Sequence, residues 1–169
     1  MNIFGRCIRY ITRGCYNFDS ACEKSVKKSL ALWEKGGKIN AWRAKRIWRR
    51  NREKYCCDFY PGVHVGNDLR IEHSQGILIG KTTIIGDDVR IYQGVNVIAK
   101  TVGDQELIDS GVRRHALIGN HVTLCAGCTI IGPIEIGDNC LIGARAIVTH
   151  DIPPNSVVIG TNRILKNVE

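Results

Sequence analysis

Hydrophobic residues recur every six positions through the C-terminal two thirds of the chain. They form two blocks, the first with Ile79, Ile85, Ile91 and Val97, the second with Ile118, Leu124, Ile130, Ile136, Ile142 and Val148. Four residues after each of these positions stands a small or branched residue, as at Val89 and Cys128. Glycine often follows the hydrophobic position directly, as at Gly80 and Gly119.

A period of six matches neither an α-helix nor a strand that alternates between two faces. It is typical of a parallel β-helix, in which each hexad supplies one short strand and turn and three hexads close a triangular coil. We therefore predict a mainly β fold, with this β-helix over residues 58–169. Few aromatics (7%) and 18 glycines suit a core of stacked branched side chains with tight corners.

The six-residue period is interrupted at two places, and functional residues can project from the coil there. The spacing from Val97 to Ile118 exceeds three hexads by half a hexad, so something must leave the coil between them. We predict one extruded loop at about residues 99–114, because loops that project from rigid scaffolds often carry binding residues. The second interruption precedes Ile79, in the sequence EHSQG at residues 72–76.

The N-terminal third has a different pattern. Residues 19–55 have apolar residues at near-helical spacing, broken at Gly36 and Gly37. Asn40 is the predicted N-cap of the second helix. One stripe of that helix contains Ala41, Ala44, Ile47 and Trp48. We interpret residues 1–57 as a short helical arm.

The net charge of +8 belongs to this arm. Residues 1–57 hold 15 Lys and Arg against 4 Asp and Glu, whereas residues 58–169 hold 9 against 12. Such an arm could contact a membrane surface or an acidic partner, or it could be a solvated helix face. No known nucleic-acid-binding motif accompanies the charge, so we expect no nucleic acid partner.

The eight cysteines are expected to be reduced thiols. Residues 1–13 have no long apolar region of a secretory signal, and no 18-residue apolar stretch crosses a bilayer, so a cytoplasmic location is expected. Cys125 and Cys128 have CxxC spacing, but no second pair follows at the distance of a zinc ribbon. We therefore expect no metal.

Four segments make the chain similar to a known family. They are DFYPGVHVG from Asp58, EHSQGILIG from Glu72, IYQGV from Ile91 and RRHALIG from Arg113. In this order they resemble the hexapeptide-repeat acyltransferases that form left-handed β-helices, and within them the serine acetyltransferase branch. The resemblance implies acetyl-CoA as donor, a hydroxyl as acceptor, and a homotrimer with its active sites between neighbouring subunits.

The resemblance also assigns roles to residues of this chain. His73 corresponds to the general base, and Asp58 to the carboxylate that pairs with it. Glu72, Arg114 and His115 correspond to residues of the acceptor site. Such chemistry suits histidine, because its unperturbed pKa near 6.5 lets it take a hydroxyl proton and return it to the thiolate. For CoA the corresponding positions are Ala126, Gly127, Ala144, Arg163 and Lys166.

The sequence says less about the identity of the acceptor than about the donor. The basic arm is shorter than the helical domain of serine acetyltransferases, and the family's GGTGK loop is replaced by VIAKTVGDQELIDSGVRR. The layout is close to short O-acetyltransferases of polysaccharide biosynthesis, so we favour a sugar hydroxyl, with serine or another small alcohol as alternatives. Trp33, Trp42 and Trp48 on the basic arm could hold such an enzyme at the inner face of the membrane.

A third possibility is a hexapeptide trimer without catalytic activity, or one that binds a metal. Three histidines would have to meet at a subunit interface, and His73, His115 and His121 are the candidates.

Overall fold

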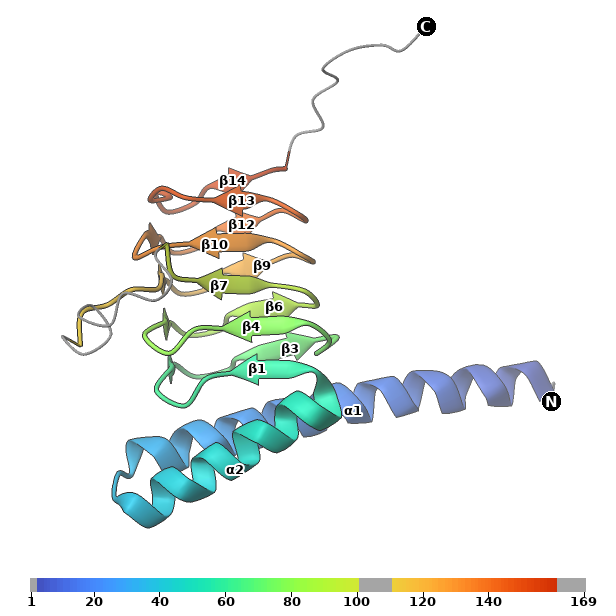
Figure 1. The fold of residues 1–169 in the computed structure, drawn as a ribbon. Coiled ribbons are helices and arrows are strands. Elements are labelled where there is room, and N and C mark those ends of the chain that lie inside the picture. The colour runs from blue at the N-terminus through green and yellow to red at the C-terminus, as the bar shows by residue number, and fades with distance from the viewer. Residues whose placement is uncertain (1–2, 101–110, 161–169) are drawn as a thin grey trace, which may run out of the picture.

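The computed structural model has two helices beneath a stack of short strands (Figure 1). It describes residues 3–100 and 111–160, with side chains from residue 19 onward. Helix α1 spans Ile3–Glu34 and helix α2 spans Lys38–Tyr55. None of the described helices is both long and apolar enough to cross a membrane.

The two helices form an antiparallel hairpin that differs from the prediction at two points. α1 begins at Ile3 instead of about residue 19, because Gly5 and Gly14 weaken the helical pattern of that stretch without ending the helix. α2 begins at Lys38 after Gly37, whose φ of 80° suits glycine. The predicted N-cap, Asn40, instead lies inside the first turn and donates its side-chain N–H to the Gly36 carbonyl at 3.0 Å.

The predicted apolar stripe of α2 is confirmed, and it packs on α1 through small residues. Ala44 is fully buried, which lets the Ser29 hydroxyl donate to the Ala44 carbonyl at 2.9 Å. Ser25 donates to the Asn51 side chain at 2.6 Å. α2 ends at Tyr55, and the left-handed backbone of the following Cys56 (φ 51°) turns the chain into the first strand.

The strands form three parallel sheets that are the three sides of a triangular prism. Sheet 1 contains β1 (Cys57–Phe59), β4 (Ile77–Ile79), β7 (Asn96–Ile98), β10 (Thr129–Ile131) and β13 (Ile147–Val148). Sheet 2 contains β2 (His64–Val65), β5 (Ile84–Ile85), β8 (Leu117–Ile118) and β11 (Glu135–Ile136). Sheet 3 contains β3 (Arg70–Glu72), β6 (Arg90–Tyr92), β9 (Thr123–Leu124), β12 (Leu141–Ile142) and β14 (Val157–Val158). The predicted β-helix is confirmed.

The hexad pattern is the core of this prism. All ten recurring hydrophobic side chains are at most 3% exposed, and those of neighbouring coils stack on one another. Burial of one such side chain contributes about 1.5–3 kcal/mol. The same buried cluster continues into Cys22, Val26 and Leu30 of α1. The helices and the β-helix thus share one core, and their division into two domains stays a prediction.

The strand register locates both interruptions of the period. Leu78 pairs with Asn96, and this spacing is one regular coil of three hexads. The pairing of Cys57 with Ile77 spans a slightly longer coil, because the corner at residues 73–76 has two extra residues. Asn96 pairs with Thr129, which lies well beyond three hexads, so a longer insertion leaves the coil after β7. Residues 101–110 of the predicted loop lie outside the described residues.

Candidate functional site

The predicted site residues lie on different edges of the prism. The edge where sheet 3 leads into sheet 1, here called the His73 corner, contains residues 73–76, 93–95, 125–128 and 143–146. The edge where sheet 1 leads into sheet 2, here called the His115 corner, contains residues 80–83, 99–100, 111–116 and 132–134. Strand β4 runs from the turn that contains His73 to Gly80, beside which the His115 ring lies.

His73 projects from the His73 corner directly after β3. Its backbone is left-handed (φ 62°), which is uncommon for residues other than glycine, and its side chain is 61% exposed. Ser74 beside it is fully buried, and Gly76 donates its backbone N–H to the Cys56 carbonyl at 2.8 Å. The two extra residues therefore raise His73 off the wall while the rest of the turn stays anchored.

A carboxylate from α1 reaches this turn. The Asp19 Oδ1 atom accepts the backbone N–H of Ser74 at 3.0 Å, and Asp19 Oδ2 lies 3.7 Å from His73 Nδ1. The Asp19 side chain is only 15% exposed. The sequence prediction missed Asp19, because no repeat or motif marks it. Its one signal is that it is an acid among the many cations of residues 1–57.

Asp58 has different partners from those predicted. The Trp48 indole donates to Asp58 Oδ1 at 2.6 Å, and Arg52 Nε lies 3.3 Å from Asp58 Oδ2. Both partners belong to α2, which passes beside β1, and Arg52 also stacks on the Trp48 ring at 5.2 Å. Asp58 therefore anchors the arm to the first coil, and the predicted Asp58–His73 pair is not formed in this structure.

On the other corner, the contacts of His115 suit a neutral imidazole. The Thr82 hydroxyl oxygen accepts the backbone N–H of Arg114 at 2.9 Å and of His115 at 3.2 Å. Its own hydrogen is then available to His115 Nδ1, which lies 2.8 Å away. Nδ1 is thus an acceptor and Nε2 carries the proton. Burial, and secondly the charge of Arg114, lower the pKa of His115.

Two further residues fix the position of His115. Gly80 leaves the space in which the imidazole lies, because a Cβ at this residue would overlap the ring. Arg113 donates to the carbonyls of His115 at 3.2 Å and Ile134 at 3.1 Å, which ties the end of the loop to the next coil. The sequence prediction named Arg114 but missed Thr82, Gly80 and Arg113. The glycines after the repeating hydrophobic residues were the available signal for Gly80.

Three of the five predicted CoA positions lie in the part of the chain that the structure describes. Ala126, Gly127 and Ala144 lie on the His73 corner, where Gly127 donates its N–H to the Gln93 carbonyl at 2.8 Å. The glycines of successive coils stack there, and a Cβ on Gly94 would lie 3.4 Å from the Gly127 Cα. Arg163 and Lys166 lie outside the described residues.

Glu72 is the last residue of β3 and pairs in register with Tyr92, so it stands directly before His73 at the same corner. The three histidines weighed as metal ligands do not meet within one chain. His121 lies on the third edge of the prism, where its ring contacts Asp88 at 3.2 Å. Among the described residues, no group of three or more His, Cys, Asp or Glu side chains could hold a metal ion.

Comparison with known proteins identifies the relatives of this chain. Residues 115–150 match the family model described as bacterial transferase hexapeptide (six repeats). A serine acetyltransferase of Mycobacterium tuberculosis is 37% identical over 129 residues, which cover 76% of this chain and 52% of that protein. The chain thus spans about half the length of the curated relatives it matches.

Solved structures give the same result. A serine acetyltransferase of Neisseria gonorrhoeae superposes with a TM-score of 0.74 at 28% identity, over 89% of this chain and 57% of that one. A serine acetyltransferase solved in complex with CoA superposes with a TM-score of 0.69 at 25% identity, over 80% of this chain and 52% of that one.

These relatives are named for serine and not for a sugar, so the comparisons do not support the polysaccharide branch that the sequence favoured. The chain is similar to serine acetyltransferases over these residues, and it has the left-handed β-helix fold of their solved structures.

Proposed function

We propose that this protein transfers the acetyl group of acetyl-CoA to the hydroxyl of serine. The observation that carries the proposal is His73, an exposed imidazole on a raised corner with a carboxylate beside its Nδ1 atom. The names of the relatives support serine, and the relative solved with CoA supports acetyl-CoA as donor.

In the proposed reaction His73 acts as general base. It takes the proton of the serine hydroxyl as the oxygen attacks the thioester carbonyl. Collapse of the tetrahedral intermediate breaks the carbon–sulfur bond, and the CoA thiolate receives the proton back from His73. Positioned proton transfer of this kind contributes about 10²–10⁴ in rate. The cationic form of His73 that exists between these steps is stabilised by a neighbouring carboxylate.

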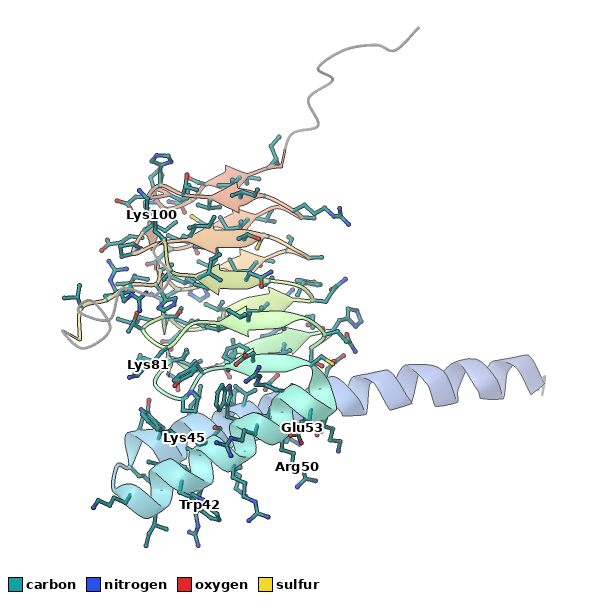
Figure 2. The ribbon with its side chains drawn as sticks, in the orientation of Figure 1. Trp42, Lys45, Arg50, Glu53, Lys81 and Lys100 are labelled. Carbon is teal, nitrogen blue, oxygen red and sulfur yellow. The ribbon has the colours of Figure 1, made fainter. Side chains whose placement is uncertain are left out.

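The His115 corner suits the carboxylate of an amino acid. Its cations include Arg114, Lys81 and Lys100, and Figure 2 shows Lys81 and Lys100 at the same edge of the stack. Neutral His115 adds an N–H donor at Nε2. A sugar hydroxyl carries no charge for these groups to bind, whereas serine carries a carboxylate. This arrangement therefore favours serine over the sugar acceptor.

The two corners point away from each other in one chain, so a complete site requires a second subunit. We infer a homotrimer in which the His73 corner of one subunit faces the His115 corner of its neighbour. The CoA chain would follow the His73 corner past Ala126, Gly127 and Ala144. Stacked glycines place no side chains on this edge, so the chain can lie close to the backbone. Sedimentation equilibrium tests this state, and a monomer with full activity would contradict it.

The first experiment measures CoA thiol release from acetyl-CoA with L-serine as sole acceptor. Saturable turnover that disappears in His73→Ala supports the proposal. If acetyl-CoA binds but is only hydrolysed with serine present, serine is not the acceptor, and nucleotide sugars and oligosaccharides are tested next.

The outer face of α2 has the composition of a membrane-surface helix. Trp42 is 60% exposed and Ile39 is 71% exposed. A surface hollow of about 630 Å³ is lined by Trp42, Lys45, Arg46, Arg49, Arg50 and Glu53. Trp42 and Arg50 point away from the stacked coils (Figure 2). Exposed aromatic and aliphatic side chains among Arg and Lys suit an anionic lipid surface.

We propose that this face contacts anionic phospholipid. Because removing the arm would also remove Asp19, the test replaces only outer side chains, as R46Q, R49Q and R50Q together. At about 1 kcal/mol per cation, binding to phosphatidylglycerol vesicles should weaken about 100-fold. Lys81→Gln with Lys100→Gln is the matched control on the other side of the chain. Equal sedimentation of wild type and the triple variant would reject the contact.

A further inference from the structure

α1 passes along the base of the stack, beneath strand β3 (Figure 1). This path brings Asp19 to the turn that contains His73, although 55 positions separate Asp19 from Ser74. The arm is therefore in contact with the proposed base, and is not a separate appendage of the β-helix.

Asp19 is fixed at two points. Its Oδ1 atom accepts the Ser74 N–H at 3.0 Å, which orients the carboxylate, and its Oδ2 atom faces His73 Nδ1 at 3.7 Å. The second distance is an ion-pair contact that is longer than a hydrogen bond. The His73 ring is exposed and therefore free to rotate, whereas the Asp19 carboxylate is held in place. Contacts between catalytic groups commonly shorten when substrate binds.

The other nearby acids are not available to His73 in this structure. Asp58 accepts the Trp48 N–H at 2.6 Å and pairs with Arg52. Glu72 makes no hydrogen bond or ion pair with His73 among the described side chains. Asp19 is thus the carboxylate on the Nδ1 side of the ring.

We propose that Asp19 of the helical arm is the positioning residue for His73, in place of Asp58. A carboxylate at Nδ1 holds the proton on that nitrogen, which leaves Nε2 free to act as base, and it stabilises the imidazolium. The effect on rate rests on the acetyltransferase function proposed above. The effect on the imidazole tautomer does not.

The kinetic test compares Asp19→Asn with Asp58→Asn. Asparagine keeps an oxygen for the Ser74 N–H but removes the charge and can place an N–H against Nδ1. We expect kcat of Asp19→Asn to fall at least about 100-fold, within the range of positioned proton transfer, with KM for acetyl-CoA unchanged. Asp58→Asn should keep kcat within a few-fold. Glu23→Gln is the matched control, an acid one turn further along α1 that pairs with Lys27.

A kinetic loss in Asp58→Asn but not in Asp19→Asn would overturn the proposal. An increase in KM for serine without a change in kcat would also overturn it, because Asp19 would then bind the acceptor. Circular dichroism and gel filtration of each variant show whether the fold is retained.

The second test does not depend on activity. ¹⁵N NMR of histidine-labelled protein reports which ring nitrogen of His73 carries the proton, with His73→Ala identifying the signal. We expect the Nδ1–H form to dominate in wild type and in Asp58→Asn, and to be lost in Asp19→Asn. If the tautomer is the same in all three, the proposal is wrong even where the enzyme is active. If the tautomer changes but no acceptor is acetylated, only the proposed function fails.

Discussion

The His73 corner and the His115 corner place the same kind of side chain in opposite environments. His73 is 61% exposed and faces a carboxylate from a distant helix. His115 is half-buried, contacts Thr82 of its own scaffold, and has a lowered pKa because of burial and the neighbouring Arg114. The roles proposed for the two histidines, general base for His73 and neutral donor for His115, rest on this difference in surroundings and not on the residue type.

The corners also differ in how they are held. The His115 ring lies in space left by Gly80, and the loop end is tied down by Arg113 through the next coil. The raised turn of His73 is tied to α1 through Asp19 and to the start of β1 through Cys56. The His115 corner is therefore built by the β-helix alone, and the His73 corner depends on how the arm docks.

The largest expected effect comes from removing the base. His73→Ala should lower kcat about 10²–10⁴-fold with little change in KM for acetyl-CoA, because proton transfer is lost while binding is kept. His115→Ala should instead mainly raise KM for serine. The measurement is steady-state thiol release at varied concentrations of each substrate. The same pattern in both variants would remove the distinction between the corners.

A smaller effect is expected from Gly80→Ala. The added Cβ would overlap the His115 ring and displace it from its place beside Thr82. We expect kcat/KM for serine to fall about 10-fold, a loss of about 1.4 kcal/mol in transition-state binding. Combining Gly80→Ala with His115→Ala should cost no more than His115→Ala alone, since both act on one group. Additive losses would show that Gly80 acts elsewhere.

The smallest effect is a pH dependence of stability. The pKa of His115 is lowered in the folded protein from its ordinary value of 6.5. Between these two values the unfolded chain binds more protons, so the free energy of unfolding rises with pH in this window. As pH falls below about 6.5, wild type should lose more stability than His115→Gln, as measured by urea unfolding at pH 5.5 and 7.5. An equal loss in both proteins would contradict a neutral, half-buried His115.

Part of the candidate site could be proposed from the sequence. The break at residues 72–76 indicated His73, and the segment RRHALIG indicated Arg114 and His115, and their functional roles stay predictions. The partners of these residues were not predictable in the same way. Thr82 stands 33 positions before His115, and nothing in the repeat distinguishes it. Asp58 was predicted beside His73, but α2 supplies an indole N–H and a guanidinium that bind it instead.

By itself the sequence determined the β-helix, because its period of six is a local pattern and the stacked side chains need no information beyond it. It also determined which histidines leave that pattern. Only the tertiary structure decided that Asp19 meets His73, since this contact depends on how a whole helix docks beneath the first coils through Cys22, Val26 and Leu30. A docking geometry is the sum of many weak packing contacts, and no short motif records it.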